Sequence, residues 1–487
     1  MIVMLNESRC RLGWVGWCAL ALWLMAGAGL LTAGSDFRLG SEVLAARGFK
    51  ELQGKRVGLL TNPSGVNRRG EWIVEVLRSA PEVNLVALFG PEHGLYGVVK
   101  AGEKVEGGKD KATGLPVHSL YGAARKPTPE MLKGLDVLVY DLQDTGTRSY
   151  TYISTMGLAM EACAEADLEF VVLDRPNPLG GVRVEGPMVE EDFRSFIGRW
   201  DVPYVYGMTC GELARMINDE GWIGRKCRLT VVPMQGWARD MTWRDTGLEW
   251  VATSPNIPNV DAVFGYPSLG LLGEVAGGSG LTIGGVVKRP FQTVGAEWLD
   301  AKKLVKELQR AKLPGLKFIA RQYTGSQSVL GCMDIVVTDP VSAPLVAVNF
   351  HVLEGVKKVS GRDLLREAER SGKSLALFDK AAGSDRWRAK WRAGARASTL
   401  VRSWSAGEEE FRKARWSYLI YRGKKEVSKV GSTGKQLASR EVVIQRGDTL
   451  FRIAGEHGVT VKEVVNLNPG LDPTRLQVGM RVRVPLR

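Results

Sequence analysis

Glu92 and His93 are the first residues whose types and position could carry out chemistry. They lie in the segment Gly-Pro-Glu-His-Gly, directly after the apolar run from Val83 to Leu88. A short run rich in Val and Leu that closes with Gly-Pro is typical of a buried parallel strand ending in a turn. Ligands of open α/β sheets bind beyond the carboxyl ends of such strands. The sequence therefore places an acid and an imidazole where a substrate would bind. The alternative is that Glu92 caps the next element and His93 packs in the turn.

Three other apolar runs, at residues 56–61, 136–140 and 170–173, are also followed by polar residues. In a right-handed βαβ series, the exits of parallel strands share one edge of the sheet. We therefore expect a single cleft lined by the carboxylate, amide and guanidinium groups near these exits. The expected cleft residues beside Glu92 and His93 are Asn62, Asp141, Asp144, Arg148, Tyr150, Asp174, Arg175 and Asn177.

The elements that must position these residues follow from the alternation of strand-like and helix-like segments. This alternation predicts an α/β fold, with a Rossmann-like parallel-sheet domain over residues 42–260. A smaller α/β domain that completes the cleft is expected over residues 261–422. Its Glu274 lies in a Gly-rich segment, which we interpret as a flexible loop that reaches the cleft. Residues 423–440 are rich in Gly, Ser and Lys and indicate a linker. It leads into a small βααβ module at 441–486.

The amino-terminal segment, residues 1–34, indicates export. Arg9 and Arg11 precede an uncharged run over residues 12–31, which ends in small residues as a signal peptide does. The run is also close to bilayer-spanning length, so an uncleaved membrane anchor is the alternative. We expect the protein in the periplasm or cell wall, with no membrane contact other than such an anchor.

The composition favours an acidic partner and disfavours several reaction classes. The net charge is +13, which favours an acidic partner such as anionic lipid or an anionic wall polymer. The sequence has no Arg-rich block or nucleic-acid-binding signature, so nucleic acid is not expected. The chain has four His and no His-Glu-x-x-His, so we expect no metal. No Gly-x-Gly-x-x-Gly follows the first strand, so we expect no nucleotide or other cofactor. The segment around Ser279 does not have the form of a nucleophile elbow.

The segment from Val442 to Pro485 resembles a LysM module. Its order is strand, capped helix, second helix and strand, with Gly-Asp-Thr-Leu at the first turn and Gly-x-x-Val-x-Val-Pro at the end. LysM modules bind glycans that contain N-acetylglucosamine, in peptidoglycan or chitin. The residues that correspond to their glycan-binding loops are Gly447, Asp448, Thr449, Leu450, Asn468, Pro469 and Gly470. The alternative is a small packing domain without a ligand.

Ordered motifs between Leu52 and Arg422 resemble the exo-β-N-acetylmuramidase family. They include Thr-Asn-Pro-Ser-Gly from Thr61, Gly-Pro-Glu-His-Gly from Gly90, Asp-Leu-Gln-Asp from Asp141 and Leu-Asp-Arg-Pro-Asn-Pro from Leu173. The resemblance implies a Rossmann-like domain with a smaller carboxyl-terminal domain. It also implies release of N-acetylmuramic acid from the non-reducing ends of peptidoglycan fragments, with the glutamate of the Pro-Glu-His-Gly turn as the favoured catalytic residue.

Glycoside hydrolysis needs an acid that protonates the leaving oxygen and a second group that acts on the anomeric carbon or on a water. We expect the catalytic residues to be Glu92, His93, Asp174 and Glu185. The other candidates for the second carboxylate are Asp141, Asp144 and Glu274. Arg148 and Arg175 could bind the lactyl carboxylate of muramic acid, because a guanidinium forks onto a carboxylate.

The sequence departs from the family pattern at two places. Tyr206 stands where many members have His, and the segment after Glu274 lacks the usual Asn-x-Ser-Glu-Gly-Arg-Gly run. Tyr206 and Glu274 are both expected to contact substrate. We interpret the chain as an exported, wall-associated exo-glycosidase that acts on peptidoglycan and its muramyl fragments. The alternative is a peptidoglycan-binding scaffold without catalytic activity.

Overall fold

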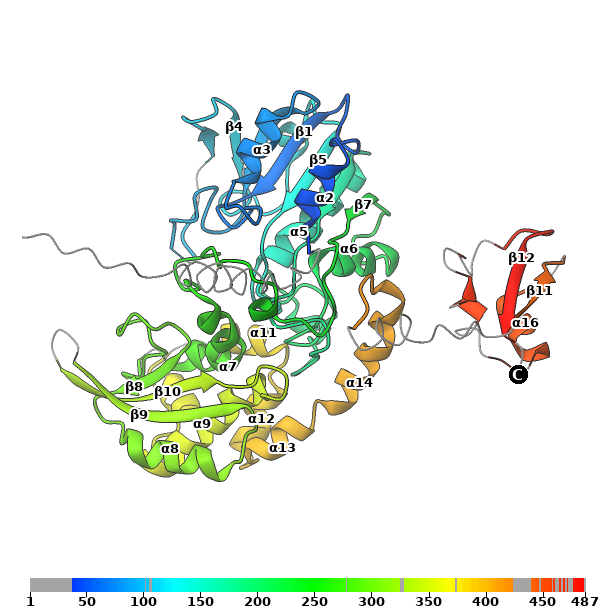
Figure 1. Cartoon of the computed structure of the whole chain (residues 1–487). Coiled ribbons are helices and arrows are strands. Elements are labelled where there is room, and N and C mark those ends of the chain that lie inside the picture. Colours follow the sequence, from blue (N-terminus) through cyan, green and yellow to red (C-terminus); the bar gives the residue numbers. More distant parts are fainter. Residues whose placement is uncertain are drawn as a thin grey trace, which may run out of the picture. The chain divides into compact units, whose positions relative to one another are not determined.

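The computed structural model describes residues 37–485, except for residues 101, 105–106, 277, 325–327, 373–374, 424–438, 446–447, 458, 460–463, 466, 469–470 and 472–475. The expected signal or anchor therefore lies outside the described residues, as do most of the expected linker and the LysM residues Gly447, Pro469 and Gly470. Within the described part, no helix is long and apolar enough to cross a membrane. The chain divides into two compact units, one ending at Tyr421 and the other beginning at Arg422 (Figure 1).

The first unit contains a seven-stranded sheet with the strand order β3-β4-β2-β1-β5-β6-β7. Neighbouring strands are parallel except for β3 and β4, which are antiparallel. The strands are β1 (Arg56–Thr61), β2 (Asn84–Gly90), β3 (Gly108–Lys109), β4 (Pro116–Ser119), β5 (Val137–Asp141), β6 (Glu169–Leu173) and β7 (Arg228–Val232). The predicted α/β fold with a parallel sheet is confirmed.

Helices cover both faces of this sheet, because buried residues alternate between the faces along each strand. Val57 and Leu59 of β1 pack on one face with α2 and α3, whereas Leu60 belongs to the opposite core with α5 and α6. The helices are α2 (Gly40–Ala46), α3 (Ile73–Ser79), α4 (Pro129–Leu132), α5 (Tyr152–Glu165) and α6 (Cys210–Asp219). Burial of apolar surface on both faces fixes the strands, so the loops at their carboxyl ends leave from one edge.

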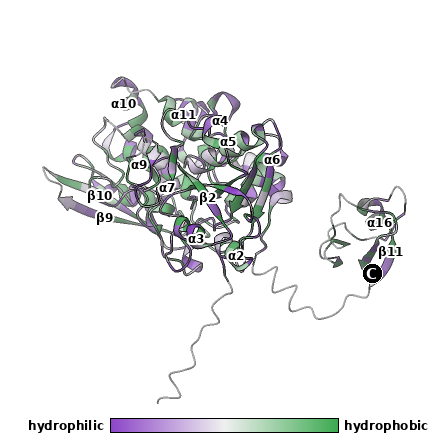
Figure 2. Cartoon of the chain, turned by 90° about the horizontal axis from the view of Figure 1, so that it is seen from above, coloured by the Kyte–Doolittle hydropathy of each residue, from purple (hydrophilic) through white to green (hydrophobic). Residues whose placement is uncertain are grey.

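The second half of the first unit combines a three-stranded antiparallel sheet, in the order β8-β10-β9, with a group of helices. The strands are β8 (Thr293–Ala296), β9 (Leu316–Thr324) and β10 (Val329–Val337). The helices are α7 (Val260–Ala276), α8 (Ala301–Arg310), α9 (Leu345–Ser360), α10 (Leu364–Arg370), α11 (Ala376–Ala382), α12 (Arg386–Arg392), α13 (Ala397–Arg402) and α14 (Ser405–Ala414). The β9–β10 hairpin projects from the unit and mixes hydrophilic and hydrophobic residues (Figure 2).

Helix α7 corrects one expectation from the sequence. Glu274 lies in the last turn of this mostly buried 17-residue helix, not in a flexible loop. The Gly-rich pattern that follows it suggested a loop, but packing of the apolar residues before it extends the helix to Ala276. Glu274 is therefore held on a regular element.

The second unit contains β11 (Ser439–Val443), α16 (Leu450–Glu456) and β12 (Arg481–Pro485), with β11 and β12 antiparallel. Among the predicted glycan-binding residues, Leu450 is buried in the core of this unit, and the Thr449 hydroxyl accepts a hydrogen bond from the Arg452 N–H in the first turn of α16. The Asn468 side chain is tied to the backbone of Arg483 in β12 by two hydrogen bonds. The positions of these residues are thus set by the packing of the module.

Candidate active site

Glu92 lies in a sharp turn just beyond the carboxyl end of β2. His93 and Gly94 both have positive φ angles, of 72° and 79°. A Cβ atom on Gly90 would lie 2.8 Å from the backbone nitrogen of Leu95, so the chain can fold back here only with glycine at this position. The turn leaves Glu92 with 7% of its surface exposed.

Three neighbours hold the Glu92 carboxylate. Its Oε1 accepts a hydrogen bond from the Gly102 N–H at 3.0 Å, and its Oε2 accepts one from the Thr151 hydroxyl at 2.7 Å. The third neighbour is Tyr121, whose pKa is raised to about 12 by burial and by its interaction with Glu92. The Tyr121 hydroxyl therefore stays protonated at neutral pH. Two donors from two segments thus orient one carboxylate, with the phenol of Tyr121 as a third neighbour.

The ring of His93 is oriented by its backbone neighbour. Its Nδ1 lies 2.7 Å from the carbonyl oxygen of Val99. A carbonyl can only accept, so Nδ1 carries the proton and the Nε2 of a neutral ring has a lone pair. His93 can therefore accept a hydrogen bond or a proton through Nε2.

Glu92 and His93 line a cavity of about 300 Å³ whose walls come from both halves of the first unit. The loop after β5 contributes Tyr150, and α7 contributes Glu274. Among the described residues that line the cavity, Glu92 and Glu274 are the carboxylates. The structure thus brings together four predicted site residues, which are Glu92, His93, Tyr150 and Glu274.

Glu274 belongs to a polar group on the α7 side of the cavity. The Ser149 hydroxyl lies 3.0 Å from the hydroxyl oxygens of Tyr204 and Tyr266. Burial raises the pKa of both tyrosines well above the usual value, and the charge of Glu274 adds to both shifts. Both phenols are therefore protonated donors near the second carboxylate.

Asp141 and Arg175 form a buried ion pair with each other across the exits of β5 and β6. The Arg175 Nε lies 2.5 Å from Asp141 Oδ1, and its Nη2 lies 3.1 Å from Oδ2. The same Nη2 donates to the carbonyl of Val66 at 2.9 Å. Because the guanidinium already forks onto a carboxylate, this arrangement does not support the expected contact of Arg175 with a lactyl group, nor that of Asp141 with substrate.

Asp174 accepts hydrogen bonds at the start of α6 rather than facing the cavity. Its Oδ1 accepts from the Gly211 N–H at 2.8 Å. Its Oδ2 accepts from the hydroxyls of Thr209 at 2.7 Å and Tyr421 at 2.6 Å. Burial raises the pKa of Asp174 to about 6, although these donors oppose the shift. The expected catalytic role of Asp174 is not supported, because both of its oxygens are used inside the fold.

Asp144 and Tyr206 pair with each other below the surface. The Tyr206 hydroxyl donates to Asp144 Oδ2 at 2.5 Å, and the Gly146 N–H donates to the same oxygen at 2.6 Å. Burial raises the pKa of Asp144 to about 6. Neither side chain lines the cavity of Glu92, so their contact with substrate is not supported.

Glu185 and Arg148 hold the two halves of the unit together. Glu185 accepts hydrogen bonds from three backbone N–H groups in the first turn of α9 and pairs with Arg183 at 2.9 Å. Arg148 is fully buried and donates to the carbonyl oxygens of Pro187, Val202 and Ala381. These contacts do not support the expected roles of Glu185 in catalysis and of Arg148 in lactyl binding, because both charged groups already pair with groups of the fold.

Asn62 and Asn177 likewise order the strand exits. The Asn62 amide donates to the Tyr152 hydroxyl at 2.6 Å. The Asn177 amide donates to the Met208 carbonyl at 2.9 Å, and its oxygen accepts from the Leu179 N–H. The turn chemistry that favours Asn after a strand therefore explains both residues.

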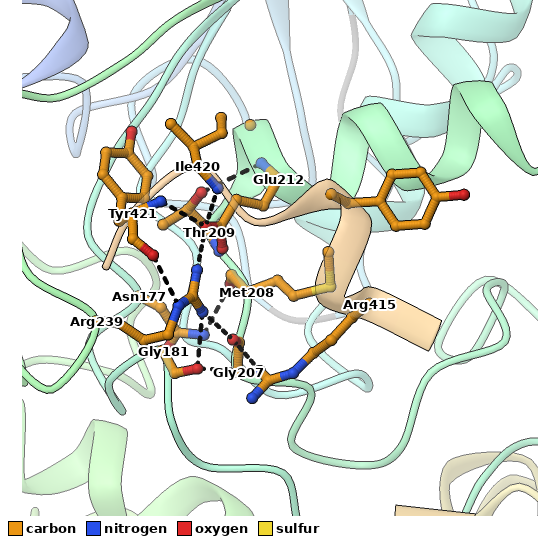
Figure 3. Close-up of polar contacts among 12 residues, drawn as sticks. Asn177, Gly181, Gly207, Met208, Thr209, Glu212, Arg239, Arg415, Ile420 and Tyr421 are labelled. Carbon is orange, nitrogen blue, oxygen red and sulfur yellow. Dashed lines mark hydrogen bonds and ion pairs between the residues drawn. The ribbon is translucent and has the colours of Figure 1, made fainter. Parts of the chain in front are cut away.

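A buried arginine cluster fixes the carboxyl-terminal end of the first unit (Figure 3). Arg239 pairs with Glu212, and both Arg239 and Arg415 donate to the carbonyl oxygens of Gly181 and Gly207. Burial, with repulsion from Arg239, lowers the pKa of Arg415 to about 9. The segment after α14 is thereby tied to the loops that follow β6.

The sequence did not single out Thr151, Tyr121 or Gly102, which hold the Glu92 carboxylate. Thr151 precedes α5, and a hydroxyl residue before a helix is usually interpreted as a cap. In this structure its side chain makes no cap hydrogen bond and bonds to Glu92 instead. The described residues contain no group of three or more His, Cys, Asp or Glu placed to hold a metal ion.

Comparison with known proteins agrees with this architecture. Residues 57–261 match the family model "Exo-beta-N-acetylmuramidase NamZ, N-terminal", residues 264–421 match its C-terminal counterpart, and residues 442–485 match the LysM domain. The chain is 41% identical over 377 residues to the peptidoglycan beta-N-acetylmuramidase NamZ of Bacillus subtilis (strain 168), covering 76% of this chain and 88% of the relative.

Two solved structures of DUF1343 family proteins from Bacteroides fragilis NCTC 9343 are also similar, each over 80% of this chain and 100% of the other. One is 43% identical with a TM-score of 0.73, and the other is 28% identical with a TM-score of 0.58. With the family models and the curated relative, these matches show that the chain belongs to the exo-β-N-acetylmuramidase NamZ family and carries a LysM domain.

Proposed function

We propose that this chain is an exo-acting glycoside hydrolase that releases N-acetylmuramic acid from the non-reducing ends of peptidoglycan fragments. The observation that carries the proposal is the position of Glu92, oriented by two hydrogen-bond donors on the wall of a cavity that Glu274 also lines. A volume of about 300 Å³ lies at the lower end of ligand pockets, which fits one terminal sugar.

In the proposed mechanism, Glu92 gives a proton to the glycosidic oxygen as the bond to the anomeric carbon breaks. Glu274 is the candidate for the second carboxylate, which attacks the anomeric carbon or activates a water. His93 Nε2 and the phenols near Glu274 are placed to hydrogen-bond the sugar. The remaining predicted carboxylates hold the loops that carry these groups.

The activity is tested with two disaccharides of opposite order. An exo-muramidase should cleave the disaccharide with N-acetylmuramic acid at the non-reducing end and release both sugars. It should leave the disaccharide with N-acetylglucosamine at that end intact. Cleavage of the second disaccharide alone, measured by liquid chromatography with mass detection, would contradict the proposed specificity.

The LysM module is proposed to hold the enzyme on peptidoglycan and so raise the local concentration of substrate. Removal of residues 422–487 should abolish co-sedimentation with insoluble peptidoglycan and leave turnover of a soluble disaccharide unchanged, because the two units are separately compact. Co-sedimentation of the full chain without turnover of any muramyl substrate would support the scaffold alternative instead.

Export belongs to the same proposal, because peptidoglycan lies outside the cytoplasm. The full chain should be found in the periplasmic or wall fraction, and a chain without residues 1–34 should stay in the cytoplasm. Recovery of the full-length chain in the membrane fraction would identify the segment as an anchor, whereas a shortened soluble product would identify a cleaved signal.

A further inference from the structure

The guanidinium group of Arg125 packs against two aromatic rings. It has no acidic partner among the described residues. Its Cζ lies 5.2 Å from the ring centre of Tyr121 and 4.4 Å from that of Phe196. The two ring centres lie 5.8 Å apart. The side chain is exposed, and no described residue forms an ion pair or hydrogen bond with its guanidinium. Rings that contact the cation in this way hold it in place and leave its N–H groups available.

The other cations around Arg125 are neutralised. Lys126 pairs with Glu161 and Glu165, at 2.9 and 2.7 Å. Arg194 pairs with Asp201 at 2.6 Å, and Arg199 pairs with Glu161 at 3.3 Å. Among these four cationic side chains, Arg125 is therefore the one whose guanidinium is available to bind an anion.

Arg125 lines a cavity of about 570 Å³, here called the flank cavity, together with Lys126, Phe196, Trp200 and Trp222. One chain segment lines both the flank cavity and the cavity of Glu92. Phe196 lines the flank cavity, and the next residue, Ile197, lines the cavity of Glu92.

Tyr121 connects the two sites directly. Its phenol interacts electrostatically with Glu92, which raises the pKa of the phenol, and its ring packs against the guanidinium of Arg125. The side chain of Tyr121 therefore lies between the carboxylate of Glu92 and the guanidinium of Arg125.

We propose that Arg125 binds a carboxylate at the end of the 3-O-lactyl arm of the muramyl residue held over Glu92. The inference rests on the proposed muramidase function and adds a specificity-determining residue to it. Muramic acid differs from glucosamine by this arm, and a guanidinium pairs with a carboxylate through two parallel hydrogen bonds. Arg148 and Arg175 are occupied by backbone and by Asp141, so Arg125 takes the role that the sequence suggested for them.

The carboxylate that pairs with Arg125 can belong to either of two parts of the substrate, and both would form the same ion pair. In an unsubstituted fragment it is the lactyl acid itself. In a fragment that keeps its stem peptide, the lactyl group is an amide and the carboxylates are those of the peptide, for which the flank cavity offers room. Substrates of the two kinds distinguish the sources.

The experiment compares the wild-type full chain with Arg125→Gln, Arg125→Lys and the control Arg194→Gln. Arg194 borders the same cavity but is already paired with Asp201. The substrates are para-nitrophenyl β-glycosides of N-acetylmuramic acid, of its lactyl methylamide and of N-acetylmuramyl-L-alanyl-D-glutamate. The methylamide has no carboxylate, so it reports any loss that does not depend on the proposed contact.

Arg125→Gln should lower kcat/KM at least tenfold for a carboxylate-bearing substrate, mainly through KM, and less than twofold for the methylamide. Arg125→Lys should recover part of the loss, and Arg194→Gln should stay within twofold on all three. A loss confined to the free acid identifies the lactyl carboxylate, and a loss confined to the dipeptide identifies the stem peptide. Equal losses on acid and amide, or no loss on either acidic substrate, would overturn the inference.

If the protein is not a muramidase, the wild type will hydrolyse none of the three glycosides, which differs from every outcome above. Calorimetric titration with free N-acetylmuramic acid, its methylamide and the muramyl dipeptide then tests Arg125 without catalysis. The wild type should prefer an acidic ligand over the amide, and Arg125→Gln should lose that preference. An unchanged preference in Arg125→Gln, or none in the wild type, would reject the contact.

Discussion

Replacing Tyr206 with Phe removes the hydroxyl group that donates a hydrogen bond to Asp144. Asp144 is buried, and its Oδ1 has no hydrogen-bond partner among the described residues. After the substitution, the Gly146 N–H still donates to Asp144 Oδ2, but the phenol donor is gone. The change should therefore destabilise the ionised form of Asp144 in the folded protein more than the neutral form.

The magnitude follows from the pKa of Asp144. Its rise from 3.8 to about 6 means that the folded state binds the proton more tightly than the unfolded chain. This contribution to stability is fully present below pH 3.8 and is lost as the pH rises through about 6, at about 1.4 kcal/mol for each pKa unit, or about 3 kcal/mol in all. A hydrogen bond to a charged group contributes about 1.5–3 kcal/mol and one to a neutral group about 1 kcal/mol. Tyr206→Phe should thus cost about 1 kcal/mol at pH 5 and about 2 kcal/mol or more at pH 8.

The assay is denaturant unfolding of the wild type and Tyr206→Phe at both pH values, followed by tryptophan fluorescence. Activity should change less than threefold for the folded variant, because neither Tyr206 nor Asp144 lines the cavity of Glu92. The same loss of stability at pH 5 and pH 8 would show that the Tyr206 hydrogen bond does not depend on the charge of Asp144. If Tyr206→Phe were as stable as the wild type but lost more than tenfold in kcat/KM, Tyr206 would have to contact substrate.

Two further substitutions separate groups that act on Glu92 from groups that hold the fold. Thr151→Val removes the 2.7 Å hydrogen bond to Glu92 but no cap bond of α5, so kcat/KM should fall about tenfold or more with an unchanged unfolding midpoint. Unchanged kinetics would show that this contact does not position the carboxylate. Glu185→Ala removes the carboxylate partner of Arg183 and the acceptor of three N–H groups of α9, so it should cost about 3 kcal/mol of stability, with kcat nearly unchanged. A stable but inactive Glu185→Ala protein would support the catalytic role that the sequence suggested.

Much of the first sheet could be predicted because its strands are short apolar runs between turn residues. The run at 56–61 is β1 as expected, and the runs near 137 and 170 are β5 and β6 within one residue at each end. Helix α7 was harder to predict, because it is apolar on all sides and contains Pro267 and several glycines. Such a helix is stabilised by its tertiary contacts and has no amphipathic pattern that a sequence would display.

The site was predicted only in part, because a polar residue at a strand exit can serve the fold as well as a substrate. Asp174 and Glu185 accept hydrogen bonds at the starts of α6 and α9, where backbone N–H groups need partners. Glu92 differs because its turn directs it toward a cavity whose other carboxylate comes from α7, far along the chain. Which exit residue faces that cavity depends on packing between the two halves, and a single sequence does not display such packing.

Turnover of the disaccharide with N-acetylmuramic acid at its non-reducing end by Glu92→Gln shows whether catalysis depends on the Glu92 carboxyl group. Glu103→Gln is the matched control, since Glu103 is exposed in the same region. We expect at least a hundredfold loss of kcat for Glu92→Gln, with Glu103→Gln within twofold of the wild type.

The loss should be smaller on the para-nitrophenyl glycoside, because nitrophenolate leaves without needing a proton. Equal losses on both substrates would assign Glu92 to attack on the anomeric carbon or a water instead of proton donation. Disaccharide turnover by Glu92→Gln at the wild-type rate would contradict the account, because catalysis would then not depend on Glu92.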